Sequence, residues 1–370
     1  MSHRQLRGVV CVLVSSWAVL AAPFAQAVEV AANSVEYVYS ANQVAGNLSA
    51  YKIDAPTGAL LPVPGSPYKT GAYPVSVSVA PNGRFVYVAN QGSDTVTGFH
   101  VDVKTGALAP IAGSPFAAGK YPDAVTVTPD GRFAYVANED ANVALVFAIN
   151  AKTGALKKVG GNAPTDAHPI SVNTSPNGKF AFVSNFNADT VGAYRINAKT
   201  GALSATGHAG KTDEHPIYTK VTPNNRFLYV SNYGSTTVSA FAIDAVSGAL
   251  TEIKGSPFVV GAKPYSVTTD PNGEFLYVAN WAGHDISVFK IEQESGALTE
   301  IQGSPFKTDW YPYAVVIDPS RHYAYVANNG ANNIGVYALD AKTGGLQQIT
   351  GSPFVSGAGP YSLAVSHVSR

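Results

Sequence analysis

A tetrapeptide that ends in asparagine recurs seven times along this chain at an almost constant spacing. The copies are Tyr39–Asn42, Tyr87–Asn90, Tyr135–Asn138, Phe182–Asn185, Tyr229–Asn232, Tyr277–Asn280 and Tyr325–Asn328. Successive asparagines lie 48, 48, 47, 47, 48 and 48 residues apart. A steady period of this length, with strand-like alternation inside it, is typical of a β-propeller or a solenoid.

The second copy shows what one repeat contains. Pro74–Ala80, Phe85–Asn90 and Thr95–Val101 alternate in the manner of strands, and Ala107–Ile111 is a weaker fourth strand. The turn Pro81–Arg84 contains Asn-Gly, which accepts positive φ. Four strands in about 48 residues is the pattern of a propeller blade.

The two ends of the chain predict how the ring closes. Seven inner strands open on proline, and the last of them, Pro360–Val368, has no outer strands after it. Val35–Asn42 begins the repeats with no inner strand before it. We therefore expect an all-β, seven-bladed β-propeller with four antiparallel strands per blade, closed by the C-terminal strand joining the N-terminal blade.

The first 27 residues have the features of a signal peptide. Arg4 and Arg7 form a positive segment, Gly8–Ala22 is apolar, and Ala25–Ala27 is a small-x-small cleavage site. We expect residues 1–27 to be removed near Ala27, residues 28–370 to form a single domain, and the protein to be periplasmic or secreted. The sole cysteine, Cys11, lies in the signal segment, so no disulfide is expected in the mature chain.

Charge and motifs exclude several classes of function. Removal of the signal segment leaves 22 basic and 24 acidic residues, which provides no basic field for nucleic acid or anionic lipid. No later segment resembles a membrane-spanning helix. The chain also lacks a phosphate-binding glycine loop, a Gly-x-Ser-x-Gly elbow and local metal-ligand spacing. We therefore expect no cofactor and no metal, and a monomer.

Three recurrent motifs give the chain a family resemblance. They are the Tyr-Val-Ala-Asn tetrapeptide, the Thr-Gly-Ala-Leu hairpins such as Thr105–Leu108, and the Gly-Ser-Pro-Phe crossings such as Gly113–Phe116. Together they resemble the bacterial lactonase-like, YVTN-repeat seven-bladed propellers, which include 6-phosphogluconolactonase-type enzymes and fungal carboxymuconate cyclases. The resemblance covers nearly all of residues 35–368 and implies a propeller fold and lactone hydrolysis.

The family's catalytic motifs are only partly matched. Lactonase-type members typically carry His-Pro-His and Pro-Arg-His at the start of certain inner strands, with an Asn-Glu after a second strand. This chain has no Pro-Arg-His, keeps half of a His-Pro-His at His168-Pro169 and at His215-Pro216, and has Asn138-Glu139.

The positions that differ between copies around the channel mouth supply the candidate site. These positions flank the strand-opening proline and follow the tetrapeptide asparagine. The candidate catalytic residues, which combine imidazole and carboxyl groups, are His168, His215, Asp123 and Glu139. The candidate ligand-binding residues, which are aromatic apart from one lysine, are Tyr121, Tyr233, Lys263, Tyr265, Trp281, Trp310, Tyr311, Tyr313 and Tyr361.

These residues allow more than one interpretation. A carboxylate beside a histidine can act as acid or base near neutral pH, and aromatic rings can stack on sugars or other flat ligands. Alternatively, the Tyr-Pro and His-Pro pairs fill the gaps between blades. The sequence therefore predicts an exported lactonase-like propeller that binds a small molecule or an extracellular partner at the mouth. One alternative is a lactone hydrolase that uses His and carboxylate chemistry, and another is an envelope or surface interaction module.

Overall fold

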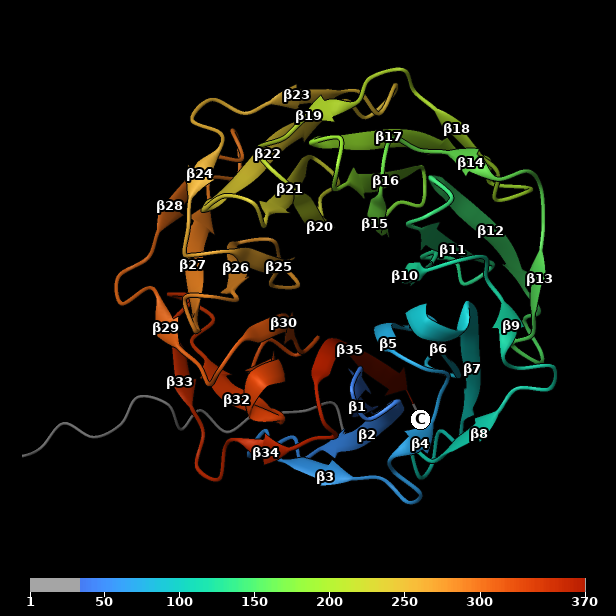
Figure 1. The fold of residues 1–370 in the computed structure, drawn as a ribbon. Coiled ribbons are helices and arrows are strands. Elements are labelled where there is room, and N and C mark those ends of the chain that lie inside the picture. The colour runs from blue at the N-terminus through green and yellow to red at the C-terminus, as the bar shows by residue number, and fades with distance from the viewer. Residues whose placement is uncertain (1–33, 370) are drawn as a thin grey trace, which may run out of the picture.

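Seven sheets are arranged in a ring around a common axis in the computed structural model, which describes residues 34–369 (Figure 1). The predicted signal segment, residues 1–27, lies outside the described residues. Each sheet is one blade, and we number the blades from the one that contains β1. The prediction of a seven-bladed all-β propeller is confirmed.

Each blade consists of four antiparallel strands and a two-residue fifth strand. The inner strands, for blades 1 to 7, are β35 (Pro360–Ser369), β5 (Pro74–Val79), β10 (Pro122–Val127), β15 (Pro169–Thr174), β20 (Pro216–Val221), β25 (Pro264–Thr269) and β30 (Pro312–Ile317). The second strands are β1 (Ser34–Asn42), β6 (Phe85–Asn90), β11 (Phe133–Asn138), β16 (Phe180–Asn185), β21 (Phe227–Asn232), β26 (Phe275–Asn280) and β31 (Tyr323–Asn328). The third strands are β2 (Asn47–Ile53), β7 (Thr95–Val101), β12 (Val143–Ile149), β17 (Thr190–Ile196), β22 (Thr237–Ile243), β27 (Asp285–Ile291) and β32 (Asn333–Leu339).

The outer edge of each blade is short. The fourth strands are β3 (Leu60–Pro62), β8 (Leu108–Pro110), β13 (Leu156–Lys158), β18 (Leu203–Ala205), β23 (Leu250–Glu252), β28 (Leu298–Glu300) and β33 (Leu346–Gln348). The fifth strands, which also pair with the third, are β4 (Tyr68–Lys69), β9 (Phe116–Ala117), β14 (Ala163–Pro164), β19 (Gly210–Lys211), β24 (Phe258–Val259), β29 (Phe306–Lys307) and β34 (Phe354–Val355). The sequence did not predict the fifth strand, because a two-residue segment shows no alternation.

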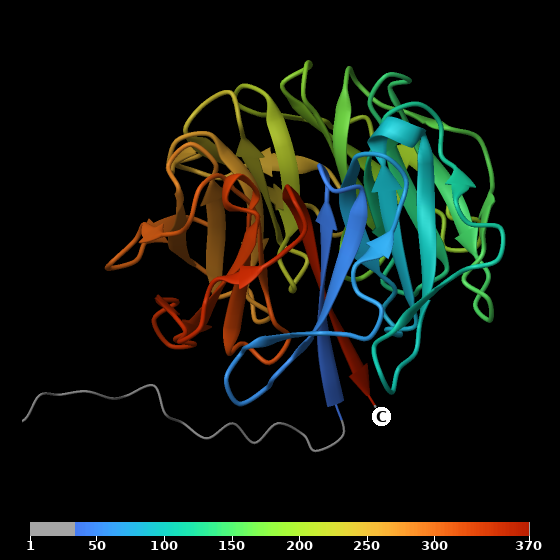
Figure 2. The same ribbon diagram turned by 60° about the horizontal axis from the view of Figure 1, so that its bottom comes forward.

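The C-terminal strand closes the ring, as predicted. β35 pairs antiparallel with β1, and Val38 lies opposite Val365. The two terminal strands therefore lie side by side in blade 1 (Figure 2). Strands from both ends of the described range supply one sheet, so β1 is paired on both of its edges and blade 1 has an inner strand as the other six blades do.

The recurrent tetrapeptide has a structural role, because in five copies the hydroxyl of its tyrosine bonds to the next blade. The buried hydroxyl of Tyr87 donates to the Gly154 carbonyl at 2.7 Å, and that of Tyr135 donates to Gly201 at 2.9 Å. Both acceptors lie in the Thr-Gly hairpin of the next blade. Tyr325 makes the same bond to Gly58 at 3.4 Å, across the ring closure. The apolar core follows the same plan, since each buried cluster draws residues from neighbouring blades.

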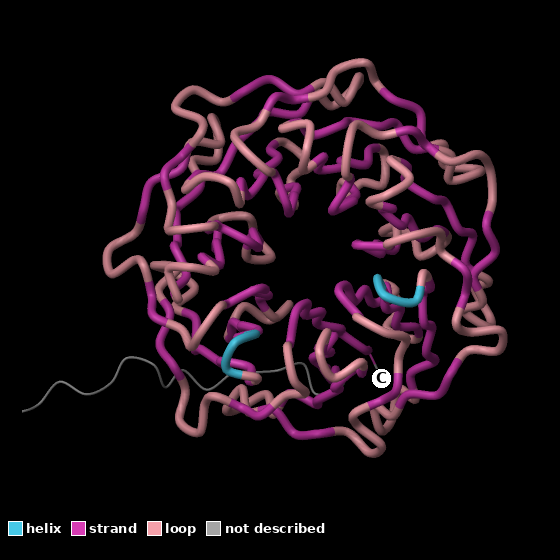
Figure 3. Tube along the Cα trace, in the orientation of Figure 1, coloured by secondary structure: helices cyan, strands magenta, loops and turns pink. Residues whose placement is uncertain are grey.

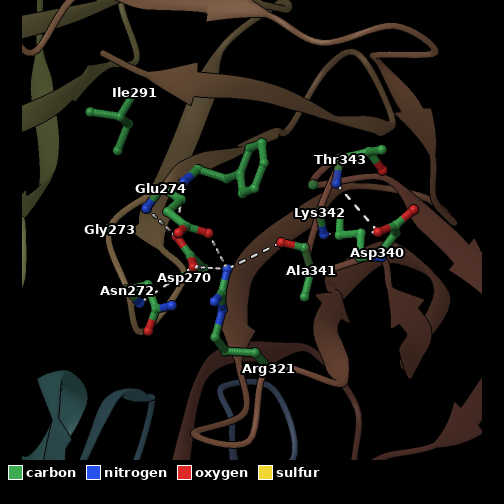
Figure 4. Close-up of polar contacts among 12 residues, drawn as sticks. Asp270, Asn272, Gly273, Glu274, Ile291, Arg321, Asp340, Ala341, Lys342 and Thr343 are labelled. Carbon is green, nitrogen blue, oxygen red and sulfur yellow. Dashed lines mark hydrogen bonds and ion pairs between the residues drawn. The ribbon is translucent and has the colours of Figure 1, made fainter. Parts of the chain in front are cut away.

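On the face opposite the mouth, Arg321 joins blades 6 and 7 (Figure 4). Its Nη2 lies 2.8 Å from Oδ2 of the fully buried Asp270 and 2.6 Å from Oε2 of Glu274. Arg321 has a left-handed φ of 62°, in a turn where several other copies have glycine. This departure from the repeat gives the buried Asp270 carboxylate a partner, as a buried charge requires.

Helical structure is limited to two single turns, η1 (Gln91–Ser93) and η2 (Asn329–Ala331), among residues 34–369 (Figure 3). No helix within this described range has the length and apolar character needed to cross a bilayer.

Candidate functional site

The channel mouth is built from two loops in each blade that are joined by one backbone hydrogen bond. The N–H after the tetrapeptide asparagine donates to the carbonyl of the residue before the strand-opening proline, at 2.8 to 3.1 Å in all seven blades. Glu139 pairs in this way with Tyr121, and Phe186 pairs with His168. The two sets of positions that differ between copies therefore lie next to each other on one face, as predicted.

The residue before each proline has a left-handed backbone, with φ between 49° and 68°. Six of the seven are Tyr, His or Lys, residue types for which this conformation is costly by about 1–2 kcal/mol. A side chain from the preceding blade compensates in several copies by accepting the hydrogen bond of the strained residue. Asn142 Oδ1 accepts from His168 N at 2.8 Å, and Asp189 Oδ1 accepts from His215 N at 2.9 Å.

Three of the predicted catalytic residues form a continuous chain at the mouth. His168 Nε2 binds Glu139 Oε1, and the Glu139 carboxyl is in turn hydrogen-bonded to Asp123. Gln91 Nε2 donates to Asp123 Oδ1 at 2.7 Å and lies 3.4 Å from Glu139 Oε2. This chain crosses two blade boundaries, because Gln91 comes from blade 2, Asp123 and Glu139 come from blade 3, and His168 comes from blade 4.

Burial and the neighbouring carboxylate determine the ionisation of Asp123. Its residue is 9% exposed, and this burial raises the pKa of the carboxyl to about 10, with the hydrogen bond and charge of Glu139 adding to the effect. Asp123 is therefore a neutral acid at pH 7, and its proton is available to donate to Glu139. Two carboxyl groups in contact then carry one negative charge between them.

His168 is oriented by this carboxyl pair and is accessible from solvent. The contact of its Nε2 with Glu139 assigns the hydrogen to that nitrogen, which leaves Nδ1 as an acceptor. The side chain of His168 is 30% exposed and that of Glu139 is 17% exposed. A carboxylate that fixes the tautomer of a partly exposed imidazole is the arrangement used in general-base catalysis.

His215, the fourth predicted catalytic residue, lies outside this chain. Its ring stacks on Phe186, with centroids 4.4 Å apart and an interplanar angle of 8°. Phe186 is also 5.8 Å from the His168 ring, so it separates the two histidines. No ion pair involves the His215 ring among residues 34–369.

The predicted aromatic residues form an outer layer and an inner layer. In the outer layer Trp281 stacks on Tyr311 at 4.7 Å, and Trp310 is 62% exposed. Trp281 is also 6.0 Å from Tyr233, which carries the Lys263 ammonium 4.5 Å from its ring centroid. This layer is a continuous aromatic surface with one cation at its edge.

The inner layer is made of tyrosines from the inner strands. Tyr265 is buried, its hydroxyl is bonded to that of Tyr361, and its ring lies 4.4 Å from Tyr313 and 5.8 Å from Tyr218. Burial raises the pKa of Tyr265 and of Tyr361 well above the usual value, so both are neutral. The rings of Tyr218, Tyr265, Tyr313 and Tyr361 therefore form one contacting cluster, which we call the tyrosine floor.

Tyr121 stands apart from both layers. It is 47% exposed and makes no ring contact within the described part of the chain, and its N–H donates to Asp94 Oδ1 at 3.0 Å. A further histidine, His284, supports the outer layer. Its Nδ1 accepts from Tyr311 N at 3.0 Å and its ring lies 4.8 Å from that of Trp310.

Four residues of the mouth were not predicted as part of the site. Gln91 and Phe186 occupy the same register as Glu139. They could have been found by comparing the residues at this register in adjacent copies. Tyr218 is the one aromatic residue at its register in the inner strands, which is a visible signal. Asn142 gives no such signal, since its role depends on a backbone angle in the next blade.

No group of three or more His, Cys, Asp or Glu side chains in the range 34–369 is arranged to hold a metal ion.

Comparison with known proteins identifies the family. A family described as "Lactonase, 7-bladed beta-propeller" matches the chain in overlapping segments, at residues 18–120, 64–172, 111–216, 164–267, 210–308 and 261–365. The chain therefore belongs to this lactonase family of seven-bladed β-propellers, as the resemblance implied. Among curated proteins none matches significantly.

Solved structures with the same fold include two candidate 6-phosphogluconolactonases, from Bacteroides uniformis and Bacteroides fragilis. Each has a TM-score of 0.77 and 22% sequence identity, and the match covers 90% of this chain and 99% and 98% of those chains. The periplasmic gluconolactonase of Pseudomonas aeruginosa is similar with a TM-score of 0.76 and 21% identity, over 90% of this chain and 99% of that chain. Similarity at these identities establishes the shared fold.

Proposed function

We propose that this protein is a lactone hydrolase whose active site is the channel mouth and whose general base is His168. The observation that carries the proposal is the chain Asp123–Glu139–His168, which places an oriented, partly exposed imidazole at the channel mouth. Membership of the lactonase family supports the same reaction class.

Each residue has a defined part in the proposed reaction. His168 Nδ1 accepts a proton from a water molecule as its oxygen attacks the lactone carbonyl. Glu139, which carries the net charge of the carboxyl pair, stabilises the imidazolium that forms. The imidazolium then protonates the ring oxygen as the carbon–oxygen bond breaks, which yields the open hydroxy acid. Neutral Asp123 holds Glu139 in place through its own proton.

The outer aromatic layer supports binding of a flat or sugar-like ring. Trp281, Tyr311 and Tyr233 offer ring faces, and Lys263 offers a positive charge for a polar substituent of the ligand. Binding of a small molecule at this layer without turnover is the second candidate function, and the same exposed aromatic layer favours it.

We also propose that the protein is exported, with cleavage near Ala27, from the character of residues 1–27. Sequencing the N-terminus of the protein recovered from the periplasm or medium tests this. An N-terminus at Met1 in the recovered protein would contradict it.

The function is tested by lactone hydrolysis with the mature chain, using sugar-acid, homoserine and aromatic lactones. We expect His168→Ala and Glu139→Gln each to lower kcat/KM about 100-fold or more. His215→Ala is the matched control, since it removes an imidazole with the same backbone but no carboxylate, and it should retain turnover. No turnover by the wild-type chain, together with saturable binding of a lactone, would favour the binding function instead.

A further inference from the structure

The inner strands present a second ring of side chains to the channel, below the tyrosine floor. These residues lie four positions after each strand-opening proline, and all seven are half-buried whereas the residues just before them are buried. They are Ser78, Thr126, Asn173, Lys220, Thr268, Val316 and Ala364. Lys220 is the one charged member of this ring.

Three consecutive copies use this side chain to bond the next inner strand. Ser78 Oγ accepts from Val127 N at 3.2 Å, Thr126 Oγ1 donates to the Val172 carbonyl at 2.6 Å, and Asn173 Nδ2 donates to the Thr219 carbonyl at 2.9 Å. The next copy, which carries Lys220, makes no such bond to the following inner strand. Among residues 34–369 no hydrogen bond or ion pair of the Lys220 ammonium is formed, so this cation departs from the structural role of its equivalents.

The surroundings of Lys220 contain no compensating charge. Removal from bulk water lowers the pKa of Lys220, and no carboxylate contributes to this shift. The strands packed against β20 supply only neutral groups: Tyr229 of β21 lies opposite Lys220, Tyr265 belongs to β25, and β15 and β16 carry no ionisable residue. Tyr218 on β20 itself is neutral too, since burial raises its pKa. Lys220 is half-buried and has no charged partner to offset its partial loss of hydration, and a bound anion would supply one.

We propose that the channel below the tyrosine floor is a binding site for one small carboxylate or comparable anion, held by the Lys220 ammonium. The polar ring members nearest in the ring order, Asn173 and Thr268, supply an amide and a hydroxyl beside it. The site is distinct from the proposed active site, because Lys220 lies four residues after the proline that opens its inner strand, whereas Asp123 lies one residue after the proline that opens its own. The inner strands run from the mouth to the opposite face, so the anion enters from the opposite face.

Protonation of Lys220 and anion binding are linked. Only the charged amine attracts the anion, so a bound anion raises the pKa of Lys220 back toward its ordinary value. The affinity for the anion must therefore fall as the pH rises and the amine loses its proton. The neighbouring tyrosines remain neutral over this range, which leaves Lys220 as the group that titrates.

Acetate titrations of the mature chain, followed by calorimetry at pH 7 and pH 9, test the proposal. We expect one acetate per chain, weaker binding at pH 9, and a loss of affinity of about tenfold or more in Lys220→Met, which keeps the length of the side chain. Lys220→Arg should retain binding. Lys290→Met, which removes an exposed lysine of β27, is the matched control and should bind as the wild type does.

Three results would overturn the proposal: no saturable acetate binding by the wild type, equal binding by the Lys220→Met chain, or binding that does not change with pH. Melting of each variant establishes that it is folded. If Lys220→Met fails to fold, the lysine side chains of the wild type are titrated instead by ¹³C NMR. Acetate should raise the pKa of one lysine in that titration. All of these measurements are independent of lactone turnover.

Discussion

His168 and His215 have the same left-handed backbone in consecutive blades, with φ of 64° and 52°. Each donates its N–H to a side chain of the preceding blade, Asn142 for one and Asp189 for the other. They differ in what the preceding blade places beside the ring, which is Glu139 for His168 and Phe186 for His215. The repeat thus supplies a common scaffold, and a single loop residue determines whether the imidazole has a carboxylate partner.

Asp123 makes the stability of the protein depend on pH. Its pKa is raised from 3.8 to about 10, so between these values the unfolded chain ionises at this site while the folded chain keeps the proton. The folded state then binds more protons, and the free energy of unfolding falls as the pH rises, by up to about 1.4 kcal/mol per pH unit. Asp123→Asn, which remains neutral, should therefore melt higher than the wild type at pH 8.

The difference between the Asp123→Asn variant and the wild type should vanish at pH 3.5, where both states of the wild type are protonated at this residue. Melting curves at the two pH values check this. A variant that is less stable than the wild type at pH 8 would contradict the assignment of a neutral Asp123.

Asn142 is a positioning residue for the proposed base. The loop that carries Glu139 also carries Asn142, so it holds both the ring and the backbone N–H of His168. Asn142→Ala should lower kcat about 10- to 100-fold with little change in KM, because the imidazole is misplaced. Asn142→Asp should restore the rate, since Asp189 accepts the equivalent hydrogen bond in the next blade.

Asp189→Ala is the control for Asn142. It removes the same kind of bond from His215 and should cost similar stability, about 1 kcal/mol, without the loss of kcat. Equal kcat values for the two alanine variants would show that the role of Asn142 is structural only.

His284 should behave as a hydrogen-bond acceptor for the loop. Its Nδ1 accepts from Tyr311 N at 3.0 Å, at the place where Asn332 accepts from Gly359 N. We expect His284→Ala to lower the free energy of unfolding by about 1–2 kcal/mol, because a strained residue loses its bond. His284→Asn should recover most of this loss. Denaturant unfolding measures both, and equal loss in the two variants would assign the effect to ring packing against Trp310.

Deletion of residues 360–370 should destabilise the whole ring. β35 supplies the inner strand of blade 1 and packs on β5 and β30, so its loss exposes β1 and opens the closure. The truncated chain should show a lower melting temperature by both far-UV circular dichroism and calorimetry. An unchanged melting temperature would mean that blade 1 does not need its C-terminal strand.

The fold could be predicted from the sequence because the same pattern of strands and turns recurs in seven copies. In five copies the tetrapeptide tyrosine bonds to a hairpin glycine of the next blade, and in all seven copies a proline begins the inner strand. The site was only partly predictable. Asp123, Glu139 and His168 were identified from their register, but the separation of His215 depends on Phe186, whose ring direction is a matter of packing.

Lys220 and Arg321 show a further limit. Both are single departures from the repeat, but they lie away from the mouth, and the predicted site residues come only from positions around the mouth. Aligning the seven copies at every register would have revealed Lys220 as the one charge in its ring and Arg321 as a large side chain at a glycine position. Their partners, or the lack of them, follow from three-dimensional packing.

The pairing of β1 with β35 also sets the entropic cost of completing the ring. It joins segments that are far apart in the sequence, and contacts between distant segments carry the largest loop-closure entropy. Closure of the ring should therefore be a late step in folding, after the strands within each of the other blades have paired.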